Sequence, residues 1–270
     1  MTARAAPLGV CVGITNTRLG AARRGIAVEL ASRLAAVAGT TVCLVGADPT
    51  DRDVERRLPL LAAGDAEYTR TRVERGVHSL DVSFLPAHRL CVVGLSDRAG
   101  VESVLPELRQ MFEYVIVDAP SRVSSGGVGI AGVLLPLLDI LLVVSALTAD
   151  ELALTRIYVD ALDEMAGARH VEVRVVSTGE PADGGLGHDQ LERRLHALPM
   201  IGGTPQLWGR PHEPTAENDD LDRAFRPIVE WIVERRQTRR RPVPSAASAV
   251  RTPPSSHHLA TARYREDFGS

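Results

Sequence analysis

The first 47 residues contain the pattern that most restricts the fold: an apolar strand, a short polar loop, a helix and a second apolar strand. Residues 7–15 predict a buried strand, residues 20–38 a helix, and residues 41–47 the second strand. This is a βαβ unit, because two parallel strands need a crossover connection between them. The predicted fold class is therefore α/β, a three-layer αβα arrangement in which helices cover both faces of a mostly parallel central sheet.

The loop at residues 16–19 connects the first strand to the helix. In a βαβ unit this loop faces the ligand. The helix that follows begins with backbone N–H groups that have no partner within the helix, and with the positive end of the helix dipole. These groups favour an anion such as phosphate.

The same loop resembles the deviant Walker A motif of the MinD/ParA family of P-loop ATPases. That motif reads roughly K-G-G-x-G-K-[ST]-[ST], and a helix reading A-V-N-L-A follows it. Residues 27–31 (AVELA) resemble this helix, which places Arg18 at the signature lysine and Arg23 at the phosphate-binding lysine. Gly20 and Ala22 fall on loop glycines. The resemblance implies a P-loop NTPase-like fold and a site for ATP or ADP made of Arg18, Leu19, Gly20, Ala21, Ala22, Arg23, Arg24 and Gly25.

The loop matches the motif in its position between strand and helix, but several of the residues that bind phosphate and Mg²⁺ are replaced. The sequence contains no lysine, and all 31 basic residues are arginine. A guanidinium binds phosphate through a planar fork and does not replace the point charge of a lysine. Arg24 stands where the family has the Ser or Thr that ligates Mg²⁺, so the usual magnesium ligand is missing. We therefore expect slow or absent ATP hydrolysis.

The segment YVIVDAP at residues 114–120 ends a strand in an aspartate, Asp118. It resembles the Walker B motif of the family, Y-D-x-V-I-I-D-[TA]-P, and by that resemblance Asp118 would orient the water shell of Mg²⁺. A strand-terminal aspartate that caps the next turn is the structural alternative. The segment follows a predicted helix and precedes a Gly-rich loop, and this order favours the Walker B interpretation.

Two further positions depart from the family pattern. The family commonly has D-x-D after the second strand, where this chain has Gly46, Ala47 and Asp48. Only the second carboxylate remains, and by the resemblance Asp48 is the candidate catalytic residue. Where family members place an asparagine that contacts adenine, this chain has Ser177-Thr178-Gly179.

The remaining elements are predicted from local patterns. Residues 63–76 are polar and predict a surface loop or an irregular helix, and residues 130–138 predict an apolar helix. Thr148 and Glu151 form a capping box at the start of a helix over residues 148–166. Further strands are predicted at 79–85, 90–95, 139–146, 171–176 and 200–208, and further helices at 101–112, 191–198 and 219–236.

Composition divides the chain into a domain and a tail. Residues 1–236 predict one MinD/ParA-like domain, and residues 237–270, rich in Pro, Ser and Arg, predict a disordered tail. The arginine cluster from Arg235 to Arg241 has two interpretations. We prefer cations at a helix C-terminus to weak contact with nucleic acid or acidic lipid.

A net charge of −3 gives no global attraction to nucleic acid or anionic membranes. Cys11, Cys43 and Cys91 lie in apolar runs without a CxxC pair, which predicts buried free thiols in a reducing compartment. The longest apolar run, residues 130–144, is interrupted and too short to span a bilayer. We expect a cytoplasmic, bacterial protein, with peripheral attachment to membrane or nucleoid as the alternative.

The resemblance implies a homodimer with a spatial role: partitioning, septum placement in cell division, or positioning of surface machinery. It implies a weak ATPase, or a pseudo-ATPase that acts as a scaffold. A second hypothesis is a short-chain-dehydrogenase-like NAD(P)-binding protein, because residues 15–29 also resemble the T-G-x-x-x-G-x-G turn. The catalytic Y-x-x-x-K of that family cannot occur without lysine. A third hypothesis is an interaction module that binds no nucleotide.

Overall fold

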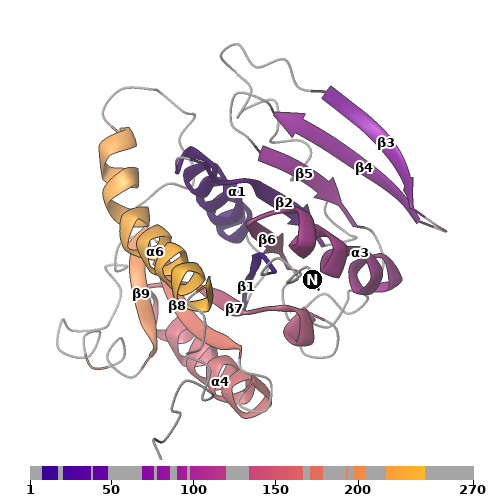
Figure 1. Cartoon of the computed structure of the whole chain (residues 1–270). Coiled ribbons are helices and arrows are strands. Elements are labelled where there is room, and N and C mark those ends of the chain that lie inside the picture. Colours follow the sequence, from indigo (N-terminus) through magenta and orange to yellow (C-terminus); the bar gives the residue numbers. More distant parts are fainter. Residues whose placement is uncertain are drawn as a thin grey trace, which may run out of the picture.

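The computed structural model describes residues 8–17, 21–37, 39–47, 69–75, 78–85, 90–95, 98–119, 134–166, 171–178, 193, 198–204 and 217–240. The strands in these ranges are β1 (Val10–Asn16), β2 (Val42–Gly46), β3 (Thr69–Arg75), β4 (His78–Leu85), β5 (Leu90–Gly94), β6 (Tyr114–Asp118), β7 (Ile140–Ala146), β8 (Glu172–Thr178) and β9 (Met200–Thr204). They form one nine-stranded sheet in the order β3-β4-β5-β2-β6-β1-β7-β8-β9 (Figure 1). All neighbours from β5 to β9 are parallel, whereas β4 runs antiparallel to both β3 and β5. The predicted α/β class with a mostly parallel sheet is confirmed.

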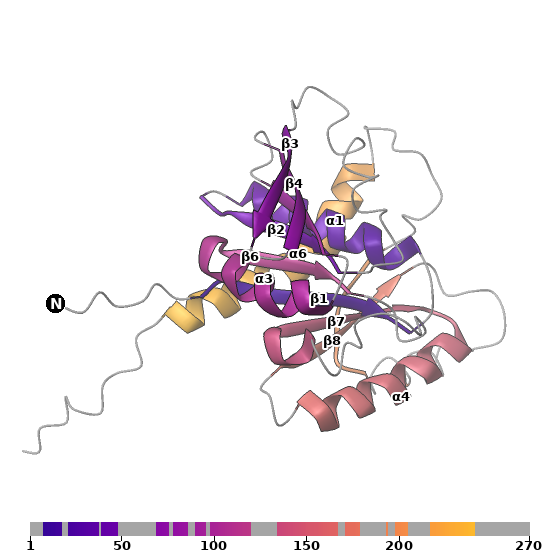
Figure 2. The same cartoon turned by 90° about the vertical axis from the view of Figure 1, so that its right-hand side faces the viewer.

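Helices cover both faces of the sheet. The described helices are α1 (Ala21–Ala36), α3 (Arg98–Met111), α4 (Ala149–Ala166) and α6 (Glu217–Arg240), with a short 3₁₀ helix η3 (Leu135–Leu137). One core cluster packs α1 and α6 against the sheet, and the other packs α3, η3 and α4 against the opposite face. Figure 1 shows α1 and α6 on the same side, and Figure 2 shows α4 running beside β7 and β8. None of the described helices is long and apolar enough to cross a membrane.

The βαβ unit forms as the sequence predicts. The strands β1 and β2 are buried almost throughout, because each is a run of apolar residues flanked by other strands. The buried stripe of α1 repeats with helical spacing and consists of Ile26, Ala27, Leu30, Ala31 and Leu34. Gly39 has a φ of 77°, a left-handed conformation that suits glycine, and it lies in the turn into β2.

One prediction of local structure is wrong. Residues 69–75 form β3, although the sequence predicts a polar loop or irregular helix there. The strand pairs with β4 along its whole length, from Thr69 opposite Phe84 to Arg75 opposite His78. The predicted helix at 130–138 is described only from residue 134, and there the chain forms a 3₁₀ helix at Leu135–Leu137 around Pro136.

The other predicted elements agree with the structure to within a few residues wherever they fall in the described ranges. The last helix, α6, continues to Arg240, beyond its predicted end at residue 236. Residues 50–61 and 121–129 lie outside the described residues, as does the tail from residue 241. Only residues 193 and 198 of the predicted helix at 191–198 are described.

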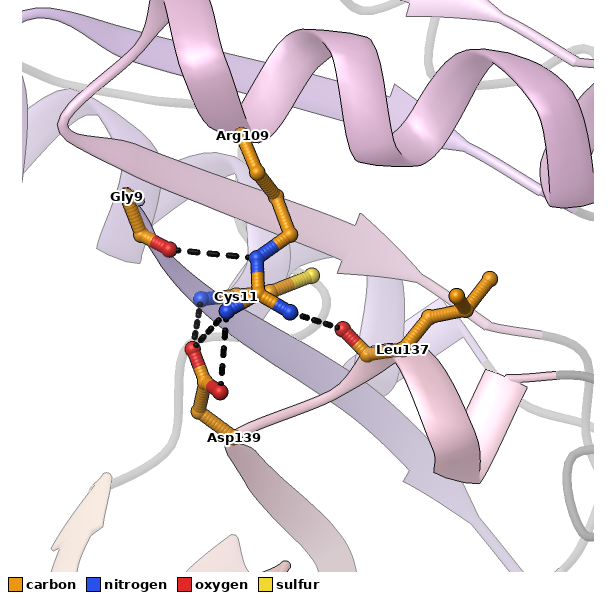
Figure 3. Close-up of polar contacts among 5 residues, drawn as sticks. All are labelled: Gly9, Cys11, Arg109, Leu137 and Asp139. Atoms are coloured by element: carbon orange, nitrogen blue, oxygen red, sulfur yellow. Dashed lines mark hydrogen bonds and ion pairs between the residues drawn. The ribbon is translucent and has the colours of Figure 1, made fainter. Parts of the chain in front are cut away.

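An arginine joins the amino end of the sheet to the helices that cover it (Figure 3). The side chain of Arg109 on α3 lies between Gly9 before β1 and Asp139 before β7. Its Nη1 donates to the carbonyl of Leu137, at 2.8 Å. The Oδ2 atom of Asp139 also accepts from the backbone N–H of Cys11, at 2.9 Å. This cluster fixes one end of the sheet, and the candidate site lies at the other.

Candidate functional site

Most of the buried polar side chains among the described residues lie at the carboxyl ends of the central strands. Asp118 is the last residue of β6, and its register partners are Ile14 of β1 and Gly46 of β2. The strands β1 and β7 end beside one another, with Asn16 opposite Val144. The buried polar residues at this edge are Thr15, Asn16, Thr17, Asp118, Ser145, Glu151, Thr155 and Thr178. In a parallel sheet this edge is where ligands bind.

On the face covered by α1, the edge presents a carboxylate and an amide. Side chains alternate along a strand, so Asp118 lies on the same face as Tyr114 and Ile116, which pack with α1. Asp118 is only 1% exposed. Asn16 lies on this face too, and its Oδ1 is buried with no hydrogen-bond partner in the described part of the chain. A primary amide can turn either its oxygen or its NH₂ group toward a ligand.

On the face covered by α4, hydroxyl groups connect the strand ends to the helix. The hydroxyl of Thr17, just after β1, donates to Oε1 of Glu151 in the first turn of α4. The hydroxyl of Thr155, one turn further along α4, donates to Oγ of Ser145 on β7 at 2.8 Å. Thr178 at the end of β8 donates to the carbonyl of Ser145 at 3.5 Å. These contacts fix the first turns of α4 against the strand ends.

The structure places part of the sequence-predicted site at this edge. Ala21, Ala22, Arg23 and Arg24 lie in the first turn of α1, which starts close to the end of β1, and Gly25 follows as a buried residue. Asp118 lies at the same edge. The side chains of residues 21–24 lie outside the described part of the chain, as do Arg18, Leu19, Gly20 and Asp48. The assignment of these residues to phosphate, metal or catalysis stays a prediction.

Thr17, Ser145 and Glu151 belong to this edge but were not predicted as site residues. Glu151 was predicted as half of a capping box, and its backbone N–H does donate to Oγ1 of Thr148, at 3.3 Å. The carboxylate of Glu151, however, reaches Thr17, which is far away in sequence. Two features of the sequence could have indicated this contact. Thr17 directly follows a buried strand, and Glu151 lies in the first turn of the helix after β7.

The donor chemistry at the edge fits a phosphate ligand better than a protein-held metal ion. A helix start, a buried amide and nearby hydroxyl groups are groups that bind phosphate. Within the described ranges, no group of three or more His, Cys, Asp or Glu residues gathers that could hold a metal ion. Asp118 is a buried carboxylate on the α1 face of this edge.

No family model and no curated protein matches the sequence. Solved structures do match the fold. The cell division ATPase MinD of Pyrococcus furiosus matches with a TM-score of 0.61 and 17% identity, over 84% of this chain and 99% of that chain. MinD of Pyrococcus horikoshii OT3, complexed with Mg-ADP, matches with a TM-score of 0.58 and 13% identity, over 87% and 100% of the two chains.

A ParA family ATPase from Chlorobium tepidum TLS matches with a TM-score of 0.51 and 15% identity, over 84% of this chain and 98% of that chain. The chain thus has the three-layer α/β fold of the MinD and ParA P-loop ATPases. These matches do not favour the dehydrogenase hypothesis. Because the identities are low, they show the fold alone, and function must be argued from the site.

Proposed function

We propose that this chain is a divergent MinD/ParA-like protein that binds adenine nucleotide, hydrolyses ATP slowly or not at all, and acts as a partition, spatial-regulation or scaffold factor. The observation that carries the proposal is the polar carboxyl edge around Asp118 and Asn16, beside the start of α1. The MinD of P. horikoshii with this fold is complexed with Mg-ADP, which supports a nucleotide ligand.

In this proposal the loop between β1 and α1 binds the phosphates. Backbone N–H groups from Gly20 to Gly25 and the guanidinium of Arg23 would contact the phosphate oxygens. Arg18 would supply the charge that the signature lysine supplies in the family, toward the nucleotide of a second copy in a homodimer. Asp118 would orient water around a magnesium ion carried by the phosphates. Bound Mg²⁺ would neutralise phosphate charge.

The same residues make efficient hydrolysis improbable on chemical grounds. Arg24 has no hydroxyl group to ligate Mg²⁺, and Ala22 replaces a loop glycine that allows the backbone to approach phosphate. The first carboxylate of the family's D-x-D pattern is also missing, which leaves Asp48 as the candidate catalytic residue. A protein with these losses would act in its nucleotide-bound state rather than through rapid hydrolysis of ATP.

The arginines at the end of α6 bear on the choice of partner. Arg235 forms an ion pair with Glu172, and Arg236 forms one with Glu113 and lies over the ring of Tyr114 at 5.3 Å. Two members of the cluster are therefore bound to the domain itself, which supports the interpretation as a helix end. The proposed action is through protein partners, at a cytoplasmic location, with nucleic acid and acidic lipid as the less favoured partners.

Equilibrium binding of fluorescent ATP and ADP, with and without Mg²⁺, tests the ligand, with NADPH as the comparison. We expect saturable adenine-nucleotide binding that Arg23→Ala weakens about tenfold, the loss of one charge-assisted contact. Arg156→Ala is the matched control, since this arginine is exposed on α4, where it forms an ion pair with Asp160 at 2.9 Å. NADPH binding without ATP binding would revive the dehydrogenase hypothesis, and binding of neither would favour the interaction module.

Hydrolysis is tested separately by multiple-turnover phosphate release from pure protein. We expect a rate far below about 1 s⁻¹, the lower end of typical enzyme turnover. Turnover at ordinary enzyme rates would contradict the proposed impairment while leaving nucleotide binding intact.

A further inference from the structure

Glu151 is a buried carboxylate in the first turn of α4, and it lies against the residue at which the chain leaves β1. Its Oε1 accepts a hydrogen bond from the hydroxyl of Thr17, 134 positions away in the sequence. Each of the two residues is only 7% exposed. Burial of a carboxylate is costly unless hydrogen bonds compensate for the lost water. A glutamate that only capped the helix would not need this position.

We propose that Glu151 is a positioning residue for the loop between β1 and α1: it holds Thr17 and so fixes where the loop begins. Arg18, the first residue of the predicted phosphate loop, follows Thr17 directly. The inference rests on the proposed function, because the loop is a nucleotide site only if the chain binds nucleotide. A loop held in place before the ligand arrives loses less conformational entropy on binding, so affinity rises.

The helix that carries Glu151 is itself well anchored. Leu152, Tyr158 and Val159 of α4 are buried in the core cluster on that face of the sheet. Thr155 donates to Ser145, which fixes the helix to the end of β7. Because β7 pairs directly with β1, the start of α4 and the end of β1 are held in a fixed relative position by the sheet. The backbone of Glu151 is therefore fixed relative to Thr17, as is required of a residue that positions a loop.

The neighbouring Asp150 separates this role from a general effect of helix charge. Asp150 and Glu151 are both acidic residues in the first turn of α4, and either would interact favourably with the helix dipole. Asp150 is exposed, whereas Glu151 is buried and contacts Thr17. The substitution Asp150→Ala removes the dipole interaction and leaves the loop contact, so it is the matched control.

Nucleotide titrations of the full chain test the proposal. Glu151→Ala and Thr17→Val each remove the contact, and we expect each to weaken Mg-ATP binding about tenfold. The double variant should be no weaker than either single variant, because both substitutions remove the same interaction. Glu151→Gln keeps an acceptor oxygen and Thr17→Ser keeps the hydroxyl. We expect both of these, and Asp150→Ala, to bind within about twofold of the parent.

The outcomes separate this inference from the proposed function. Unchanged nucleotide affinity in folded Glu151→Ala and Thr17→Val would overturn the inference while the proposed function stands. If the parent protein binds no nucleotide, the proposed function fails, and urea unfolding of the same variants decides the inference. Non-additive losses of unfolding free energy in the double variant would then support Glu151 as the residue that holds the loop, and additive losses would overturn it.

Discussion

The Nη2 atom of Arg109 lies 3.0 and 2.8 Å from the two carboxylate oxygens of Asp139, and both side chains are largely buried. The same guanidinium donates from Nε to the carbonyl of Gly9, at 3.2 Å. The contacts join α3, the segment before β1 and the segment before β7 at the amino end of the sheet. The nucleotide is proposed to bind at the opposite end, so this pair is a structural element whose loss should affect stability first.

Arg109→Ala should therefore strongly destabilise the fold. It leaves the carboxylate of Asp139 buried without its cation, a situation that costs about 3–5 kcal/mol. Arg156→Ala, which breaks an exposed pair with Asp160 on α4, should cost about 0.5 kcal/mol or less. Urea unfolding of both variants measures the difference. Equal losses of unfolding free energy would show that the Arg109 cluster does not hold the sheet as described.

Gly9→Ala should be destabilising because there is no room for a methyl group. A Cβ atom at Gly9 would lie 2.0 Å from the backbone carbonyl oxygen of Phe112, so the backbone itself must shift. We expect a loss of about 3 kcal/mol or more in thermal or urea unfolding. Gly39→Ala is the comparison: no described atom lies within 4 Å of a Cβ placed there, and its φ of 77° is unfavourable for alanine by about 1 kcal/mol. A smaller loss at Gly9 than at Gly39 would contradict the packing.

The Cys11 thiol should make the protein less stable in alkali. Burial raises the pKa of this thiol from 9.0 to about 12, with the positive charge of Arg109 opposing the shift and Asp139 adding to it. A folded pKa above the unfolded one means that the stability is complete below pH 9 and is lost as the pH rises from 9 toward 12. At pH 10 the loss of unfolding free energy from Cys11 alone should be on the order of 1 kcal/mol.

Urea unfolding of the parent and of Cys11→Ala at pH 8 and pH 10 checks this expectation. The fall in unfolding free energy between the two pH values should be smaller in Cys11→Ala than in the parent. Cys43 is also buried, and burial is the main cause that raises its pKa, with Cys11 as a minor cause. Because Cys43 remains in both proteins, most of its contribution is common to the two. An identical fall in both proteins would mean that Cys11 ionises as freely in the folded state as in the unfolded one.

Much of the fold could be predicted because local patterns and the fold agree. The strands at residues 10–16 and 42–46 are apolar runs with the helix between them, and the structure pairs both with β6. The strand that ends in Asp118 was predicted from the same kind of run. In each case burial on both faces leaves a continuous apolar signal in the sequence.

Local sequence patterns do not reveal structure that depends on pairing between segments distant in the sequence. The strand β3 reads TRTRVER, and its pairing with β4 gives it a structure that its polarity conceals. A period of two in Thr69, Thr71 and Val73 was the signal that could have revealed it. The Thr17–Glu151 contact joins residues that no local pattern connects, because only the pairing of β1 with β7 brings them together.

The carboxyl edge of the sheet is proposed to hold the nucleotide, and amide hydrogen exchange with and without Mg-ATP measures this most directly. We predict slower exchange in peptides that contain residues 10–25 and 114–119, and unchanged exchange around Arg109 and Asp139 at the amino end. Saturating Mg-ATP that leaves the carboxyl edge unprotected, or that protects only the amino end, would contradict a nucleotide site at the ends of β1 and β6.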